Sequence, residues 1–395
     1  MGLGLAPGNP LYRRSLAALF LVGISAFGLM YAPQPVLVPI GREFGTSAST
    51  TSLLMSATTL GIALAVLPLG RMSALWGRAR VLIGGLALVS VGGVVIAVAP
   101  WWWLIVLVRF GQGVGMAGVI VSAMAWVVDH ALPGAVTRMG ALYISGTTVG
   151  GMTGRILSGL ISQWFDSWRF GILVTSVMLA AAGAGAHLLL PRTAPIPRPD
   201  RSRAAAAAPD PQRSRRHAMY AVGGIGMMVF SGIYTALAFR VAAPPFEVGT
   251  AVTGFLFLTY LSGTFTAAMA GRLAGRHSVA QVMAVSMVVA TVGVLLSLVN
   301  NLATVIVSLL LLSAGFFAAH AVANATSARL STDPSGAAAR YALSYYLGSS
   351  AGAYVYGHVW DIAGWGWIVV LTLALTAVLA VWLWLTAGRG APTGR

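Results

Sequence analysis

Apolar residues occur along this chain in long uninterrupted runs rather than in periodic stripes. The runs "SLAALFLVGISAFGLM" (15–30), "VLIGGLALVSVGGVVIAVA" (81–99) and "WIVVLTLALTAVLAVWLWLT" (367–386) approach or reach the ~20 residues that cross a bilayer as a helix. We therefore expect an all-α membrane protein with twelve transmembrane helices. They are predicted at about 14–38, 52–70, 81–99, 103–127, 139–163, 170–190, 218–242, 250–270, 279–299, 302–324, 340–360 and 366–387.

The polar segments between these runs alternate in their arginine content. One set of alternating segments contains Arg13, Arg14, Arg71, Arg78, Arg80, Arg138, Arg192, Arg198, Arg201, Arg203, Arg213, Arg215, Arg216, Arg272, Arg276, Arg329, Arg340, Arg389 and Arg395, and the other contains only Arg42 and Arg169. Basic loops stay in the cytoplasm, so this asymmetry predicts that the first set and both termini are cytoplasmic. The tryptophans of "WWW" (101–103) and "WGW" (365–367) fall on the opposite side, as an aromatic belt does. We expect a multi-pass protein of a bacterial cell (inner) membrane.

One linker and an internal repeat divide the chain into halves. The stretch "PRTAPIPRPDRSRAAAAAPDPQRSRR" (191–216) has no apolar face, which predicts a cytoplasmic linker over 191–217 between six-helix bundles at 1–190 and 218–395. "YISGTTVG" (143–150) matches "YYLGSSAG" (345–352), and "GRMS" (70–73) matches "GRLA" (271–274), at nearly the same offset. Six helices return the chain to its starting side, so the bundles are parallel repeats with a cavity between them at mid-membrane.

Composition then excludes several classes of function. With 58% hydrophobic and 8% charged residues, the chain has too few charges for the surface of a soluble protein of 395 residues. The net charge of +16 invites a nucleic-acid-binding interpretation. However, most of the arginines lie in segments predicted on one side of the membrane, so we attribute the charge to membrane topology and expect no nucleic-acid partner. The chain has no cysteine and no lysine, which excludes thiol chemistry and the lysine of an ATP-binding loop. Its histidines are scattered and it has no paired-acid motif, so we expect neither an enzyme nor a metal or cofactor.

Glycines form a second pattern inside the runs. "GVGMAG" (113–118) fits the spacing of a dinucleotide-binding loop, but no strand precedes it and it lies within a predicted membrane helix, so that reading fails. Small residues spaced along one helix face let two helices approach closely and also suit a sliding interface. Such packing or conformational positions are Gly113, the pair Gly111 and Gly115, the stripe Gly146, Gly150, Gly154 and Ser158, and the pair Gly348 and Gly352.

Three of these stretches resemble motifs of the major facilitator superfamily. "RFGQGVGMAG" (109–118) resembles its fourth-helix motif, "GTTVGGMTGR" (146–155) the glycine-rich fifth-helix motif of its antiporters, and "GRMSALWGRAR" (70–80) its loop 2–3 signature. Further stretches resemble the branch of small bacterial drug or sugar efflux permeases: "YAPQPVLVPIGREFG" (31–45), "VAAPPFEVGTAVTGFLFLTYLSGTF" (241–265) and "GFFAAHAVAN" (315–324). The resemblance implies transport by alternating access in exchange for protons. Gly70, Gly77 and Arg78 of the loop signature remain, but Ala74 replaces the aspartate that helps to latch one conformation in the family.

Three arginines lie within the predicted helices. Arg109, about six residues into its helix, either snorkels to the outer interface or faces the cavity as a cation that couples substrate or protons, with Gln112 and Met116 on its face. The resemblance favours the second alternative. Arg155 lies at a similar depth and either serves the cavity or joins two helices. Arg240, near the outer end of its helix, is expected to be an interface anchor.

Proton coupling needs a group that titrates, and all the acids fall in loops or at helix ends. His320, with Asn324 on its face, is either a satisfied core residue or the coupling group, and Asp129 either pairs with a loop arginine or carries the proton. Tyr31, Gln34 and Tyr234 are expected to line the cavity with Met116 and Asn324.

The candidate residues and the resemblance together predict a monomeric exporter of small drug-like or sugar-like molecules, which lies in the lipid bilayer and is driven by inward movement of protons. One alternative is an organic-anion carrier that uses Arg109 and Arg155. Another is an integral-membrane enzyme, which the scattered histidines and the lack of a paired-acid motif disfavour.

Overall fold

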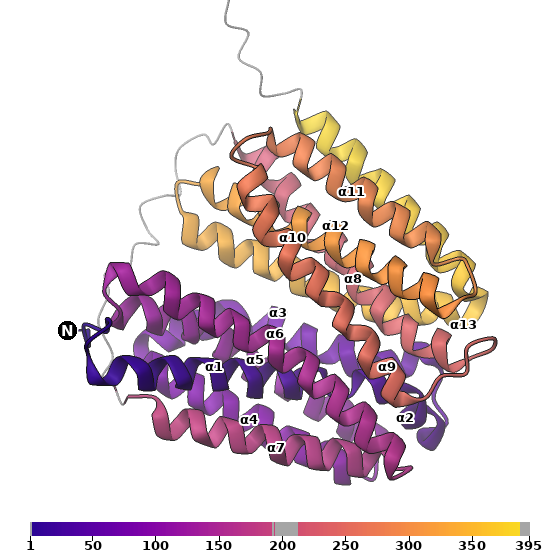
Figure 1. Ribbon diagram of the computed structural model, residues 1–395, viewed down its shortest axis with the longest axis horizontal. Helices are drawn as coiled ribbons and strands as arrows, with labels where there is room; N and C mark the ends of the chain where they lie inside the picture. The colour runs from indigo at the N-terminus through magenta and orange to yellow at the C-terminus, as the bar shows by residue number, and fades with distance from the viewer. Residues whose placement is uncertain (1, 192, 194–211, 388–395) are drawn as a thin grey trace, which may run out of the picture. The chain divides into compact units, whose positions relative to one another are not determined.

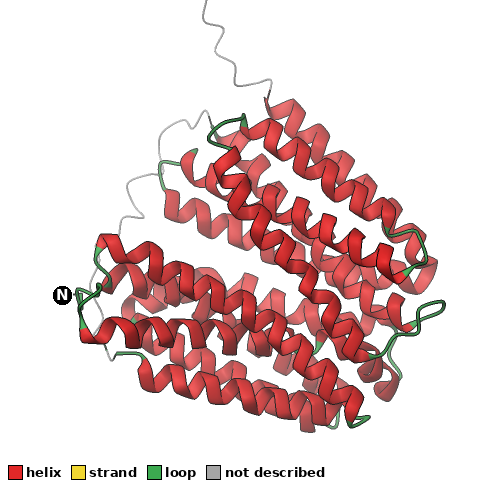
Figure 2. Cartoon of the chain, in the orientation of Figure 1, coloured by secondary structure: helices red, strands yellow, loops and turns green. Residues whose placement is uncertain are grey.

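The structure is a computed structural model that describes residues 2–191, 193 and 212–387. Within these residues the regular elements are all helical (Figure 2). The α-helices are α1 (Pro10–Tyr31), α2 (Leu37–Phe44), α3 (Ala48–Trp76), α4 (Arg78–Val98), α5 (Trp102–His130), α6 (Pro133–Trp164), α7 (Trp168–Leu189), α8 (Arg213–Ala242), α9 (Thr250–Leu256), α10 (Tyr260–Leu273), α11 (Val279–Leu296), α12 (Leu302–Arg329) and α13 (Pro334–Ala387). The predicted all-α class is confirmed. The predicted helices 14–38 and 250–270 are each interrupted, whereas 340–360 and 366–387 are joined in α13.

Ten helical segments of the described chain are long and apolar enough to cross a membrane. They do not include α6, whose 32 residues are rich in glycine and contain Arg138 and Arg155. One of them, Gly336–Thr386, lies within α13, which bends at Gly364, where φ is 74° and the backbone is not helical. Glycine adopts that conformation without steric cost. The count of twelve crossings, with α6 as one and α13 as two, therefore stays a prediction.

Polar residues set where several helices begin. The Asn9 side chain accepts from the amide of Leu11 at the start of α1, and Asn301 accepts from the amide of Ala303 at the start of α12. At the start of α11, Ser278 and Gln281 form a reciprocal capping box. These contacts satisfy amides that have no partner within their own helix.

The contacts divide the described chain into two units. Unit 1 is formed by the described residues within Met1–Thr46, Leu53–Pro199 and Val248–Phe257, and unit 2 by those within Ser47–Ser52, Asp200–Glu247 and Leu258–Arg395. Most of the predicted linker, residues 194–211 with residue 192, lies outside the described residues, and α8 already begins at Arg213 within its predicted end. The predicted domain boundaries therefore stay a prediction. The short segments 47–52 and 248–257 each pack with the unit that does not hold their sequence neighbours.

Segment 47–52 is held in unit 2 by a carboxylate. The two side-chain oxygens of Asp361 accept hydrogen bonds from the amides of Ala48 (2.9 Å) and Ser49 (2.8 Å), the first residues of α3. A carboxylate at a helix N-terminus satisfies orphan amides and complements the helix dipole. From the sequence, Asp361 is expected only to lie in a loop or at a helix end, and this contact is not predicted.

Glycines of α6 bring it against α1 in unit 1, and these two helices lie side by side in Figure 1. A Cβ atom added at Gly146, Gly150 or Gly154 would fall within 3 Å of backbone atoms of α1. In unit 2 the equivalent crossing joins α13 to α8, where a Cβ at Gly348 or Gly352 would meet the backbone of Gly224 or Met228. Both stripes therefore lie at close helix crossings, the first within unit 1 and the second within unit 2.

Replacing Gly150 with leucine should therefore destabilise unit 1. The side chain would overlap the backbone of Ile24, and α1 and α6 would have to separate at a cost of about 1–3 kcal/mol or more. The measurement is the thermal unfolding midpoint of the purified protein in detergent. Gly111→Leu is the matched control, because a Cβ at Gly111 meets no atom within 4 Å. Equal midpoints for Gly150→Leu and the wild type would contradict close packing at this crossing.

Candidate functional site

The first candidate membrane segment, Pro10–Phe44, is interrupted after Tyr31. α1 ends at Tyr31, a 3-10 turn covers Gln34–Val36, and α2 begins at Leu37. Carbonyl groups in the last turn of a helix have no amide partner within the helix and carry the negative end of its dipole. The break thus places unsatisfied acceptors inside unit 1. Two side chains use them: Arg109 donates to the carbonyl of Met30 (2.8 Å), and Ser158 donates to the carbonyl of Ala32 (2.6 Å).

Arg109 is fully buried and ties three helices together. From α5, its Nε donates to the carbonyl of Leu54 on α3 at 2.8 Å, and one terminal nitrogen donates to the carbonyl of Met30 on α1 at 2.8 Å. Its other terminal nitrogen donates to Oε1 of Gln112 (2.8 Å), and the amide nitrogen of Gln112 donates to the carbonyl of Val89 on α4 (2.8 Å). All these acceptors are neutral dipoles, and they satisfy a cation that has no ion pair in the described chain.

This network differs from both alternatives for Arg109 in the sequence analysis. The side chain is 0% exposed, so it neither snorkels to the interface nor presents its charge to an open cavity in this structure. The guanidinium group of Arg109 can donate to α1 because the interruption of that helix leaves the Met30 carbonyl available at the same depth. Any transport role of Arg109 therefore acts through the arrangement of α1, α3 and α5.

Arg155 lies on the other side of the same break, between two aromatic rings. Its guanidinium carbon is 3.8 Å from the ring centroid of Tyr31 and 4.4 Å from that of Phe257. Its Nε donates to Oε1 of Gln34 and a terminal nitrogen donates to the carbonyl of Gly151, each at 2.8 Å. A planar cation between ring faces is a favourable arrangement in a site without water. Of the residues predicted to line a cavity, Tyr31 is half-buried and Gln34 is buried against this cation.

In unit 2, His320 on α12 is anchored by a tyrosine. The hydroxyl of Tyr341 donates to the His320 carbonyl (3.2 Å), and the same oxygen is 2.9 Å from the His320 Nδ1. The Tyr341 hydroxyl thus orients the His320 ring through Nδ1, whichever of the two ring nitrogens carries the proton. A neutral imidazole held in this way keeps one nitrogen that can accept a proton.

Rings around His320 form a continuous surface, which we call the aromatic face: Phe230, Tyr260, Phe316, Phe317, His320 and Tyr345. Neighbouring ring centroids lie at ordinary aromatic distances, 4.4 Å for the stacked Phe230 and Phe316 and 4.9 Å for His320 and Tyr345. Phe230 and Phe316 are buried, whereas the other four rings are half-buried. The face therefore has a buried base and a half-buried rim. Of this face, only His320 is predicted from the sequence; the i, i+4 spacing of Tyr341 and Tyr345 is a signal that these two tyrosines share one helix side.

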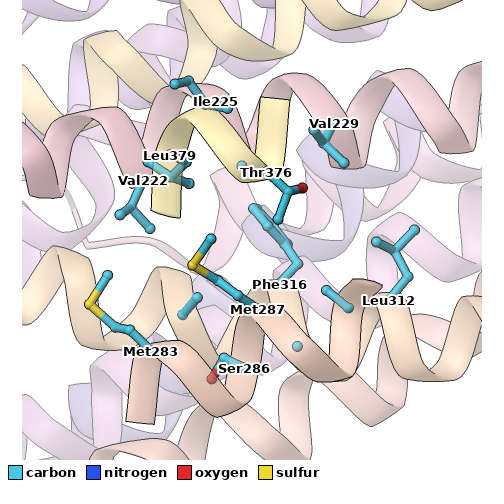
Figure 3. A pocket seen from close by; sticks show the side chains of 14 residues that line it. Val222, Ile225, Val229, Met283, Ser286, Met287, Leu312, Phe316, Thr376 and Leu379 are labelled. Atoms are coloured by element: carbon cyan, nitrogen blue, oxygen red, sulfur yellow. The ribbon is translucent and has the colours of Figure 1, made fainter. Parts of the chain in front are cut away.

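A small cavity lies on the buried side of Phe316. Its volume is about 60 Å³, and its labelled lining in Figure 3 is apolar apart from Ser286 and Thr376. Such a space holds few partners for water, so it is expected to be dry. Two flexible methionines, Met283 and Met287, point toward it (Figure 3) and can repack as Phe316 moves.

Three other predicted lining residues lie elsewhere. Met116 and Tyr234 are fully buried, so they are core residues of units 1 and 2 in this structure rather than lining ones. Tyr234 has a reason to be there: its hydroxyl is 2.7 Å from both the Thr259 and the Ser313 hydroxyls, which satisfies it away from water. Asn324 is exposed near one end of α12. The predicted interface anchor, Arg240, is also buried, 4.3 Å from the Trp365 ring centroid.

The loop between α3 and α4 is anchored by the pair expected from sequence. Nε of Arg78 lies 3.3 Å from a carboxylate oxygen of Asp129 at the end of α5, which confirms that Asp129 pairs with a loop arginine. Gly77, the single residue between α3 and α4, has a φ of 101°, a conformation that favours glycine. Gly113 packs on the backbone of Thr58 in α3, whereas a Cβ at Gly70 would meet open space, so Gly70 has no close-packing role.

Comparison with known proteins places this geometry in a family. The sequence profile of the Major Facilitator Superfamily matches residues 19–240. Inner membrane transport protein YnfM of Escherichia coli (strain K12) is 31% identical over 378 residues, 95% of this chain and 90% of that protein. The MFS-type transporter YybF of Bacillus subtilis (strain 168) is 27% identical over 383 residues, 96% and 94% of the two chains. A bacterial homologue of the human lysosomal transporter Spinster has the same fold, with a TM-score of 0.78 at 15% identity and coverage of 97% and 98%. The chain belongs to the Major Facilitator Superfamily and is a multi-pass membrane transporter.

Proposed function

We propose that this chain exports small organic molecules by alternating access, in exchange for protons that move inward. The observation that carries this proposal is the aromatic face of unit 2. Ring surfaces with one imidazole and a few hydroxyls bind flat amphipathic molecules through apolar contact. Such a surface selects only weakly for the charge of a ligand or for the arrangement of its hydrogen-bonding groups. Drug-like compounds with an aromatic ring are the cargo that fits such a face best, ahead of sugars.

The surroundings of Phe316 support a broad rather than a narrow choice of cargo. The adjacent cavity and its methionines allow the ring to shift without loss of a polar contact. A surface that repacks in this way binds related shapes with similar affinity. Protons are proposed as the coupling ion because His320, whose ring is oriented by the Tyr341 hydroxyl, is a histidine within the face and can take up a proton. We further propose that the protein acts as a monomer with its arginine-rich loops and both termini in the cytoplasm.

An organic-anion carrier is the second candidate, favoured by one observation. Unit 1 buries two guanidinium groups, Arg109 and Arg155, which contact carbonyl and side-chain amide oxygens and aromatic rings. Such a region has a positive potential that attracts an anion. In this candidate Arg155 binds the anion after its ring partners move aside.

Counterflow in proteoliposomes distinguishes the two candidates. Vesicles are loaded with a panel of unlabelled compounds in matched sets, each an aromatic scaffold that carries an amine, no charge or a carboxylate. Uptake of one labelled compound then reports which unlabelled compounds exchange with it. The proposal predicts exchange of the neutral and amine members, with Tyr345→Ala and Phe317→Ala each reducing it at least tenfold. Exchange confined to carboxylates, lost in Arg155→Gln and retained in Phe317→Ala, would favour the anion carrier instead.

A further inference from the structure

Each unit contains a cavity at the same place in its repeat. In unit 1 a cavity of about 430 Å³ lies among α3, α4 and α5, and in unit 2 one of about 470 Å³ lies among α10, α11 and α12. Every residue that lines the first has its counterpart, 200 or 201 positions later, among those that line the second. Trp76 thus corresponds to His277, and Arg80 to Gln281. A packing defect would not recur residue by residue across two halves of different sequence.

Close helix crossings border both cavities. A Cβ added at Gly115 of α5 would lie 2.7 Å from the carbonyl oxygen of Gly85 on α4, and one at Gly315 of α12 would meet the carbonyl oxygen of Ser286 on α11. All four residues line the cavities. Small residues at such a crossing bring two backbones together and leave the space beside them unfilled. At Gly84 an added Cβ would meet no atom within 4 Å, so the space there is open.

The two cavities open on the apolar outer surface of their units. Their borders include the exposed side chains of Leu88 in unit 1 and of Met269 and Val285 in unit 2, and the helices that form them are candidate membrane spans. An apolar hollow in such a surface faces lipid chains rather than water. Both volumes fall within the ~300–1,000 Å³ of ordinary ligand sites.

Polar and basic residues mark one end of each cavity. In unit 1 these are Trp76, the last residue of α3, and the exposed Arg80 in the first turn of α4. In unit 2 they are His277 and Gln281, with the exposed Arg272 and Arg276 in and beside the same connection. An apolar cleft that ends in a tryptophan and cations matches a lipid whose chain lies in the cleft and whose phosphate lies at the end.

We propose that each cavity binds one acyl chain of an anionic phospholipid, with the phosphate held beside Arg80 in unit 1 and beside His277 in unit 2. The lipid comes from the membrane leaflet on the side of the arginine-rich loops, because the polar end of each cavity lies at one of these loops. The two ends differ in their lining: unit 1 lines the cavity with the cation Arg80, whereas unit 2 lines it with Gln281 and has Arg272 and Arg276 beside it. This proposal does not depend on the cargo or on its direction of transport.

Native mass spectrometry of the full-length protein tests this proposal. The protein is purified in detergent, equilibrated with an equimolar mixture of phosphatidylglycerol and phosphatidylethanolamine of identical chains, and the retained lipids are counted. The wild type is expected to retain two phospholipids, with phosphatidylglycerol preferred. Gly84→Leu fills the first cavity and should lower the count by one, and Val285→Trp should do the same for the second. Arg80→Gln should keep the count and reduce the preference for phosphatidylglycerol about fivefold, the effect of one basic residue near an anionic surface.

Matched variants make the result decisive. Gly111→Leu adds the same side chain at another open glycine of the same unit, outside the cavity, and Arg138→Gln removes another exposed arginine; neither should change count or preference. The proposal is overturned if Gly84→Leu and Val285→Trp retain as many lipids as the wild type, or if the wild type shows no preference for phosphatidylglycerol. Displacement of the lipid by a transported compound, one for one, would also overturn it and assign the cavities to the cargo.

Discussion

Replacing Arg109 with alanine will abolish transport and will also lower the stability of the protein. The guanidinium group donates to acceptors on α1, α3 and its own helix, and the carbonyls of Met30 and Leu54 would lose these buried hydrogen bonds. At roughly 1 kcal/mol for each hydrogen bond between membrane helices, we expect a loss of about 3 kcal/mol. The sequence alone predicts lost transport with the fold intact, and the network adds the cost in stability.

Two measurements on the Arg109 variants test this expectation. Thermal unfolding in detergent, followed by tryptophan fluorescence, reports stability, and counterflow in proteoliposomes reports transport. Arg109→Lys keeps the charge near the end of α1 but cannot reach all the acceptors with a planar fork, so it should fall between alanine and wild type in both measurements. Arg138→Gln, an exposed arginine of α6, is the control and should change neither. Wild-type stability and transport in Arg109→Ala would show that the hydrogen bonds of Arg109 are needed for neither.

Replacing His320 with glutamine will uncouple transport from protons. Glutamine keeps a polar side chain of similar size within the aromatic face but cannot take up a proton. A charged imidazolium is costly among closed rings and tolerable in a hydrated cavity, so its protonation can be linked to the side on which the protein is open. We expect accumulation driven by a pH gradient to fall at least tenfold while counterflow, which needs no proton, continues.

Asp129→Asn is the comparison for His320→Gln. Asp129 is paired with Arg78 at the end of α5, so its replacement should loosen the loop between α3 and α4 and leave coupling intact. Tyr341→Phe removes the hydroxyl that orients the ring and should reduce coupling partially. If His320→Gln keeps gradient-driven accumulation and Asp129→Asn loses it, coupling belongs to Asp129. Full accumulation in both variants would place coupling at a different acid.

The helices and their packing could be predicted from sequence because membrane burial leaves direct signals. Apolar runs set the length of the helices, and the glycine stripe of Gly146, Gly150 and Gly154 marks the helix that approaches α1. The pairing of Asp129 with a loop arginine also follows from chain position, because both lie at helix ends expected on the same side. These features depend on local pattern or on the repeat, which a single sequence contains.

The partners of the buried polar groups could not be predicted. From the sequence, Arg109 is predicted to be a cation that faces a cavity. Its actual acceptors include backbone carbonyls, which every residue has and which therefore leave no signal in a sequence. They become available only because α1 ends at Tyr31, inside a run that looks continuous. Phe257 beside Arg155 and Asp361 at the start of α3 are likewise far away in sequence from the groups they contact. No local spacing connects them, and only the packing of helices brings them together.

The direct test of the central claim is transport by the wild-type protein in proteoliposomes of known orientation with an imposed pH gradient. Substrate identified by counterflow is supplied on the cytoplasmic side, and protons are supplied in excess on the opposite side. The account predicts movement of substrate away from the cytoplasmic side above its equilibrium concentration, with protons moving the other way, and collapse of this accumulation when an ionophore removes the gradient. Equal steady-state distribution with and without the pH gradient, in vesicles that still perform counterflow, would contradict proton-driven export.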